Sequence, residues 1–168
     1  LLVAFSKDVI GVTDTEYGWI EAGLGAGFAI GAMLMNYGKN IDPLTWVRIS
    51  AVFDGLFFLL LGFTNSFWTE LFAIIGVGVA SVIAMVAAPT MMQMEAETEF
   101  IGRVIGFYST VFMLGSVISM GLAGVVSSLF DMRDILIYGG GFIIVAALFF
   151  SLKRMPRTHA QDPESAQA

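Results

Sequence analysis

Two acidic residues lie inside long apolar stretches, where a carboxyl group could bind protons or a polar part of a ligand. Asp54 is about ten residues into the apolar run 44–63, ~15 Å from its start if the run is helical. At that depth in a bilayer a charge costs several kcal/mol unless it is paired, protonated or hydrated. Asp54 is therefore either a proton-coupling or substrate-facing carboxyl, or a structural group hydrogen-bonded to a neighbouring helix. Glu21 lies only about five residues inside the run 16–37 and can reach the interface, so it is the second candidate.

Three uncharged side chains are further candidates for contact with a substrate. Tyr108 and Ser109 in the run 102–127 either line a cavity or hydrogen-bond across helices. Met85 in the run 67–92 suits a promiscuous apolar site, although methionines also fill cores and face lipid.

The residue sets needed for enzyme or metal chemistry are missing from the sequence. The chain has no cysteine, and its single histidine, His159, stands in the polar tail. No group of His, Asp and Glu has the spacing of metal ligands, and no nucleophile is accompanied by a base. We therefore expect a protein that is not an enzyme and that holds no metal or other cofactor.

The stretch EAGLGAGFAIGAMLMNYGKN, residues 21–40, imitates a phosphate-binding loop. It does not fit the G-x-x-x-x-G-K-[ST] pattern, because six residues separate Gly31 from Gly38, and no strand precedes its G-x-G. Gly23, Gly27 and Gly31 instead recur every four residues and so share one helix face, which lets a second helix approach closely in lipid. Gly76 begins a similar series of small residues in 67–92.

The elements that must hold these residues are membrane-spanning helices. The chain of 168 residues is 57% hydrophobic and 13% charged, whereas an average globular domain is about 25% charged. About 20 apolar residues cross a bilayer, and hydropathy predicts five complete spans at 16–37, 44–63, 67–92, 102–127 and 135–152. The predicted fold class is an all-α polytopic transmembrane bundle over 1–155. Leu1–Phe5 is interpreted as the stub of a sixth helix, Ser6–Thr15 as a polar loop, and 156–168 as a disordered tail.

Basic residues predict the orientation of the bundle. One side of the membrane would carry Lys39, Arg48, Arg103, Lys153, Arg154 and Arg157, and the other side only Lys7 and Arg133. The positive-inside rule then places the C-terminus in the cytoplasm, with the bundle in what we expect to be a bacterial inner membrane. The sequence has only eight lysines and arginines and lacks a strongly basic surface for nucleic acid, so the expected partners are membrane lipids and a small-molecule substrate.

Two links between spans resemble signatures of the major facilitator superfamily. The stretch GAMLMNYGK, residues 31–39, is similar to the second-half copy of its loop signature, with Met35 where an acid is usual. The stretch EFIGRVIG, residues 99–106, is similar to the segment before the eleventh helix of that family. The resemblance implies that a cytoplasmic gate includes Gly31, Gly38, Lys39, Glu99, Gly102 and Arg103.

The resemblance also implies an architecture and an activity. The five spans would be helices eight to twelve of a twelve-helix transporter, and the N-terminal half would be their partner. The third span would line the cavity, with Met85 near the substrate, while the second and fifth spans would be peripheral. Similarity to the drug- and siderophore-exporter branch implies proton-coupled efflux of small amphipathic compounds. The alternatives are a non-transporting scaffold or receptor half, and a lipid transporter of the same fold.

Overall fold

The fold is an all-α bundle, as the sequence predicts. The computed structural model describes residues 5–38 and 40–152, except the side chains of residues 8, 9, 127, 128 and 150–152. Within these ranges every regular element is helical: a π-helical turn η1 (Phe5–Ile10) and the helices α2 (Asp14–Tyr37), α3 (Pro43–Phe63), α4 (Phe67–Glu95), α5 (Ile101–Leu129) and α6 (Met132–Leu152). All five α-helices are long and apolar enough to cross a membrane.

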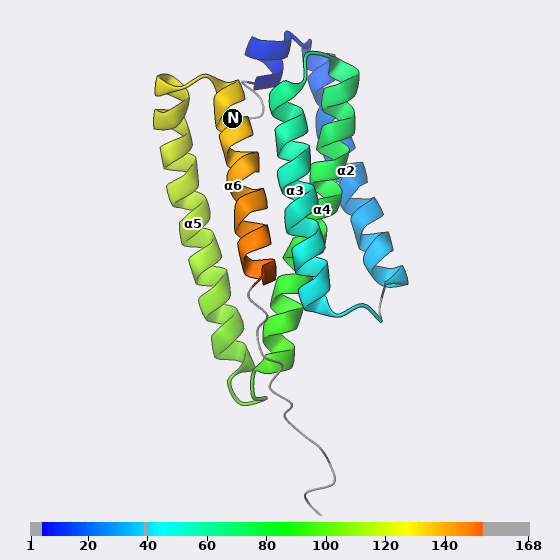
Figure 1. Ribbon diagram of the computed structural model, residues 1–168, viewed down its shortest axis with the longest axis vertical. Helices are drawn as coiled ribbons and strands as arrows, with labels where there is room; N and C mark the ends of the chain where they lie inside the picture. The colour runs from blue at the N-terminus through cyan, green and yellow to red at the C-terminus, as the bar shows by residue number, and fades with distance from the viewer. Residues whose placement is uncertain (1–4, 39, 153–168) are drawn as a thin grey trace, which may run out of the picture.

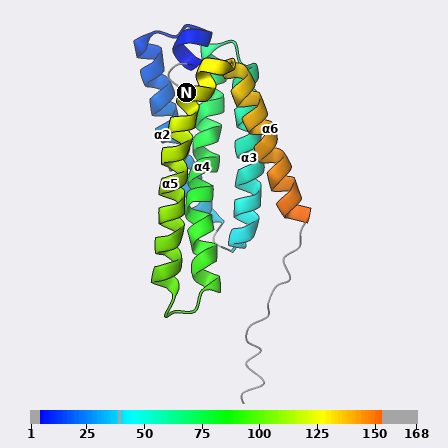
Figure 2. The ribbon, with the colours of Figure 1, turned by 90° about the vertical axis from the view of Figure 1, so that its left-hand side faces the viewer.

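The helices run side by side, and the bundle has two distinct ends (Figure 1). We call the end with η1 and the α3–α4 and α5–α6 links the upper end, and the end with the α2–α3 and α4–α5 links the lower end. Helix α4 packs against both α2 and α3, and α3 also packs along α6. Helix α5 has few contacts with the other helices, and Figure 1 shows its upper part standing away from α2 and α3. Figure 2 is viewed from the side of α5, which lies nearest the viewer. None of its described side chains is buried.

The start of α2 follows from a capping box. The hydroxyl of Thr13 accepts a hydrogen bond from the backbone N–H of Glu16 at 3.3 Å, and the Glu16 carboxylate accepts one from the backbone N–H of Thr13 at 2.8 Å. Just before this cap, Gly11 has a φ of +79°, a conformation that strongly favours glycine. The chain therefore turns sharply between η1 and α2.

The segment before α2 differs from the prediction. The polar composition of Ser6–Thr15 predicts a loop, but Phe5–Ile10 forms a π-helical turn and Phe5, Ser6 and Val12 are buried. Val12 belongs to the main hydrophobic core, and its backbone N–H donates to the Ser6 carbonyl at 3.1 Å. Two apolar side chains thus anchor a segment that looks polar overall. Residues 1–4 of the expected helix stub and the expected tail 156–168 lie outside the described residues.

Glycines bring α2 and α4 together backbone to backbone. A Cβ at Gly27 would overlap the carbonyl oxygen of Ile75 and would lie 3.0 Å from the Cα of Gly78. A Cβ at Gly31 would lie 2.7 Å from the carbonyl oxygen of Val79, also on α4. The series spaced by four residues is thus the side of α2 that faces α4, and no side chain larger than hydrogen fits at its centre.

Other glycines divide into two groups. A Cβ at Gly76 would overlap the ring of Phe57 on α3, so this glycine also lies in a helix contact. On α5, by contrast, a Cβ at Gly102, Gly106 or Gly115 would meet nothing within 4 Å among the described residues.

Candidate functional site

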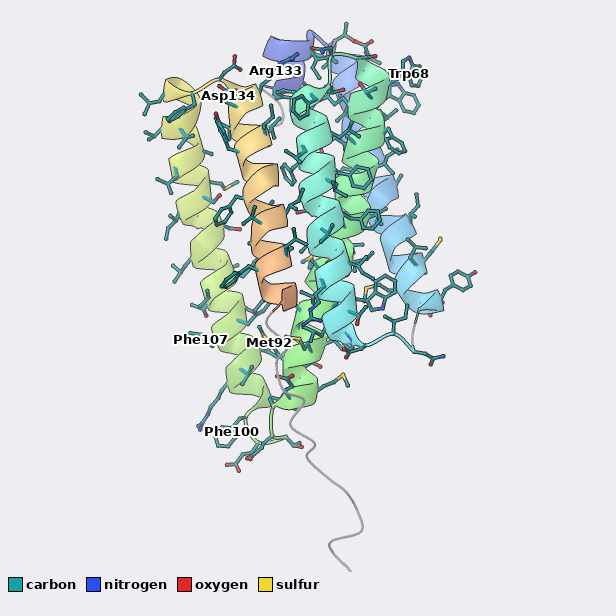
Figure 3. All side chains as sticks on the ribbon, in the orientation of Figure 1. Trp68, Met92, Phe100, Phe107, Arg133 and Asp134 are labelled. Atoms are coloured by element: carbon teal, nitrogen blue, oxygen red, sulfur yellow. The ribbon has the colours of Figure 1, made fainter. Side chains whose placement is uncertain are left out.

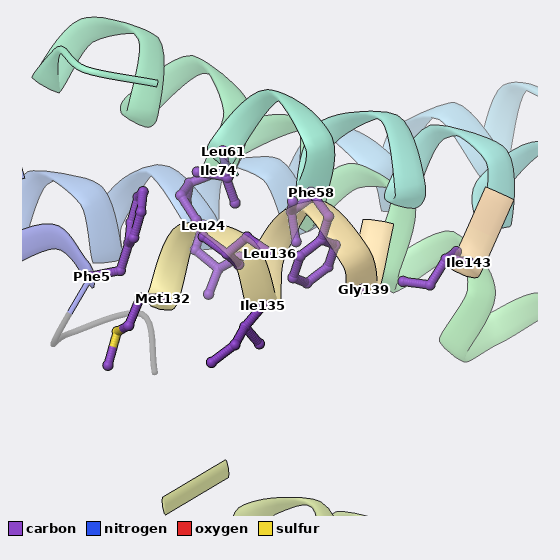
Figure 4. A pocket seen from close by; sticks show the side chains of 11 residues that line it. Phe5, Leu24, Phe58, Leu61, Ile74, Met132, Ile135, Leu136, Gly139 and Ile143 are labelled. Carbon is purple, nitrogen blue, oxygen red and sulfur yellow. The ribbon is translucent and has the colours of Figure 1, made fainter. Parts of the chain in front are cut away.

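An apolar groove of about 380 Å³ opens in the upper half of the bundle. Figure 4 shows side chains from four helices and from η1 around it. The lining residues are all apolar: Phe5, Leu24, Phe58, Leu61, Ile74, Val77, Met132, Ile135, Leu136, Gly139 and Ile143. Its volume is near the lower end of the range of small-molecule sites, which is about 300–1,000 Å³.

Asp54 lies one helical turn below this groove. It precedes Phe58 by four residues on α3, so both occupy the same face of that helix. Its carboxyl shares a side-chain hydrogen bond with Ser81, which follows Val77 by four residues on α4. Asp54 and Ser81 therefore form a polar pair. Each lies one turn closer to the lower end than a groove-lining residue on the same face of its helix.

The Asp54 carboxyl has incomplete hydrogen bonding. Its Oδ1 atom is buried and has no hydrogen-bond partner among the described residues. Asp54 is about 16 Å along α3 from Pro43, close to the middle of this helix. A charged carboxylate at that depth of a bilayer costs several kcal/mol unless it is paired, protonated or hydrated. Ser50, one turn before, is not its partner in the described contacts, because the Ser50 hydroxyl donates to the carbonyl of Val47 at 3.0 Å.

Glu21, the second sequence candidate, lies elsewhere. It is exposed on α2 and accepts a hydrogen bond from the hydroxyl of Tyr17, one turn closer to the upper end. The groove takes only Leu24 from α2. The structure therefore places Glu21 on the exposed surface of α2 rather than beside Asp54.

A third carboxyl, that of Glu70, was missed by the sequence reasoning. It is more buried than the carboxyls of Asp54 and Glu21. Glu70 in the first turn of α4 is fully buried, and its Oε1 accepts a hydrogen bond from the hydroxyl of Ser6. Glu70 lies in the predicted span 67–92, so the same search for acids in apolar runs that found Asp54 could have found it. Its burial could not be predicted, because the covering residues come from the expected loop.

Comparisons with known proteins identify the family. The family model of the Major Facilitator Superfamily matches residues 1–168. The chain belongs to the Major Facilitator Superfamily. It is also 28% identical over 163 residues to a Bacillus subtilis (strain 168) protein described as the uncharacterized MFS-type transporter YkuC. That match covers 92% of this chain and 37% of the relative, and no solved structure gives a significant match. With its five apolar helices, this member of the superfamily is an integral membrane protein.

Because the chain belongs to the superfamily, the positions of the predicted gate residues in the structure are of interest. Gly31 faces α4, and the ring of Trp46 covers Gly38 while its Nε1 donates to the Gly38 carbonyl at 3.3 Å. On the other link, Glu99 is exposed and the Arg103 guanidinium lies 5.5 Å from the centre of the Phe100 ring. Figure 1 shows the two links on different sides of the lower end, so the described residues do not form one cluster. Lys39 lies outside the described residues, and a Cβ added at Gly102 would meet nothing within 4 Å among them.

The three uncharged candidates do not line the groove. Met85 is 68% exposed, one turn beyond Ser81 on α4, and so lies on the same face as the Asp54 pair. Tyr108 is half-buried and stacks on Phe112 with ring centres 6.2 Å apart, and Ser109 is exposed. Of these three, Met85 is the one that the structure places on the helix face shared with a candidate carboxyl.

Proposed function

We propose that the protein is a secondary active transporter that exports small amphipathic compounds in exchange for protons. The observation that carries this proposal is the incompletely bonded carboxyl of Asp54 directly below an apolar groove, at mid-depth of the bundle. Membership in the superfamily and the description of the relative as a transporter support it.

The chemistry of the groove favours one class of substrate. A compound with an apolar body and a cationic group would place the body among residues such as Phe58 and Leu136 and the cation near Asp54. Many drugs have this form. Siderophores are the less favoured class, because their anionic oxygens would find no basic side chain among the groove-lining residues.

Exchange follows from competition for one carboxyl. If Asp54 is neutralised either by a proton or by the cationic group of a substrate, then binding of one releases the other. A buried carboxyl that binds neither is disfavoured by several kcal/mol, so the empty and ionised state is rare. This competition couples the two movements in opposite directions.

The whole transporter would need more than this chain. We propose an N-terminal half as its partner, since superfamily members rock two halves around a midplane site and the chain matches only 37% of its relative. The bias of basic residues in the sequence, six on the side of the membrane that would carry the C-terminal tail and two on the other, supports a cytoplasmic C-terminus and a bacterial inner membrane as the location. This chain alone would then bind without transporting.

The test is Asp54→Asn in the intact protein, assayed in everted membrane vesicles that accumulate a fluorescent lipophilic cation. Asparagine keeps the size of the side chain and can bond to Ser81, but it cannot bind a proton. We expect at least about tenfold slower proton-driven uptake, the equivalent of losing 1.4 kcal/mol or more. The matched control is Glu21→Gln, which neutralises an exposed carboxyl and should leave uptake unchanged. Normal uptake by Asp54→Asn at normal expression would refute the proposed role.

The groove also fits a second occupant, an apolar helix from another part of a longer protein. Phe5, the first described residue, lines the groove, and the relative is much longer than the match. Because this chain has no cysteine, a thiol introduced as Leu136→Cys can be labelled selectively once any other cysteines have been removed. Protection of this thiol by the substrate supports a binding site, whereas a thiol that is unreactive under all conditions supports a covering helix.

A further inference from the structure

Glu70 is a fully buried acid whose hydrogen bonding is incomplete. It lies in the first turn of α4, is 0% exposed, and accepts one hydrogen bond at Oε1 from the hydroxyl of Ser6. Its other oxygen, Oε2, is buried and has no partner among the described residues. The activity proposed above makes no use of this group.

The cover over Glu70 is the short segment from Phe5 to Val12. Phe5 and Ser6 are 1% and 0% exposed, and the N–H of Val12 donates to the Ser6 carbonyl at 3.1 Å. Gly11, with its φ of +79° and no neighbour within 4 Å of an added Cβ, lies in the turn that joins this segment to α2. The segment is thus held by its two ends and by the Ser6–Glu70 bond.

The charged groups around Glu70 are occupied by other partners. Lys7 on η1 is exposed and forms a 2.5 Å ion pair with Asp14. Tyr17 on α2 is close enough to Glu70 for an electrostatic effect, but its hydroxyl donates to Glu21.

The basic residue of α6 is also occupied. Arg133 lies at the upper end of the bundle (Figure 3), where it donates to the Thr64 carbonyl at 3.3 Å and to the side chain of Asn65. No cation among the described side chains therefore pairs with Glu70.

We propose that Glu70 is a proton-binding site and that the Phe5–Val12 segment is a cover that opens when the proton leaves. An ionised carboxylate buried without a cation costs several kcal/mol, whereas a protonated carboxyl costs far less. Lifting the segment exposes the carboxyl to water and removes that cost. The covered state binds more protons than the open state, so its population falls as the pH rises.

The opening can be measured by thiol labelling of the intact protein in membranes, with any other cysteines removed. Val12→Cys puts a buried thiol on the Phe5–Val12 segment. Thr15→Cys puts an exposed thiol nearby, in the first turn of α2. The ratio of the two labelling rates cancels the chemical pH dependence of the reaction. We expect this ratio to rise with pH, by up to about tenfold per pH unit.

A variant of Glu70 that cannot ionise tests whether this carboxyl controls the opening. Glu70→Gln keeps the shape and the bond from Ser6 but cannot ionise, so the labelling ratio should stay low at every pH. Glu21→Gln is the matched control and should keep the wild-type profile. A Glu70→Gln protein that opens with the wild-type pH profile would overturn the proposal.

A second variant covers the case in which Glu70→Gln does not fold. Ser6→Ala removes the hydrogen bond that holds the cover but leaves the acid in place. The cover should then open at lower pH, with up to about tenfold faster labelling at a given pH. An unchanged profile for Ser6→Ala would contradict the proposal, and neither labelling result depends on whether the protein exports anything.

Discussion

Gly27→Ala is expected to force α2 and α4 apart. The added Cβ would overlap the carbonyl oxygen of Ile75 and lie 3.0 Å from the Cα of Gly78, whereas ordinary contacts begin at 3.4 Å. Both neighbours are backbone atoms, so no side chain can rotate away and the helices must separate by roughly half an ångström or more. Overpacking of this kind costs about 1–3 kcal/mol.

The matched control is Gly25→Ala on the same helix. A Cβ there meets nothing within 4 Å, so this variant receives the gain in helix propensity, up to about 1 kcal/mol, without the clash. Gly23→Ala should be intermediate, because its nearest neighbour at 2.7 Å is the Cδ1 atom of Leu71, which can move. The three variants therefore form a graded series.

The assay is thermal unfolding of the intact protein in a mild detergent, followed by circular dichroism. At about 2–4 °C per kcal/mol, Gly27→Ala should melt from a few to about ten degrees below Gly25→Ala. If Gly27→Ala and Gly25→Ala melt at the same temperature, the backbone contact between α2 and α4 does not exist as described.

Two further changes probe the contacts of α6 by the same melting assay. Arg133→Ala should cost about 0.5–1.5 kcal/mol, because it removes the 3.3 Å hydrogen bond to the Thr64 carbonyl; no loss would show that this bond is not formed. Gly55→Ala should cost about 1–3 kcal/mol, because its Cβ would lie 2.9 Å from the Gly140 carbonyl oxygen, whereas Gly141→Ala meets nothing within 4 Å. Equal melting of the two glycine variants would exclude tight α3–α6 packing.

The fold class could be predicted because the bilayer restricts the choice of structure. An apolar run of about 20 residues in lipid must be helical, so hydropathy alone gives five helices in the right order. Local chemistry gives some of the ends: Pro43 occupies the first turn of α3, and Thr13 with Glu16 caps α2. Hydropathy does not detect the polar first and last turns of these helices. For this reason the predicted spans miss the start of α2 at Asp14 and the end of α4 at Glu95.

The candidate site was less predictable, because burial depends on neighbours that are distant in sequence. Asp54 is an obvious acid in an apolar run, but its partner Ser81 lies on another helix and looks ordinary in the sequence. Glu70 is close enough to a span end to reach water on its own. In the structure it is buried, and Ser6, from a segment that looks like a loop, donates a hydrogen bond to its carboxyl.

One face of α4 connects the buried Glu70 with Ser81, the partner of the half-buried Asp54. Glu70, Ile74, Val77 and Ser81 recur at helical spacing, so the proposed proton site lies above the groove and the partner of Asp54 lies below it. Glu70 and Ser81 are about 16 Å apart along the helix axis. The residues between them on this face are apolar and line the groove, so no chain of hydroxyls on α4 carries a proton from one acid to the other. The acids should therefore titrate as separate sites, Asp54 in response to what occupies the groove and Glu70 in response to the cover at the upper end.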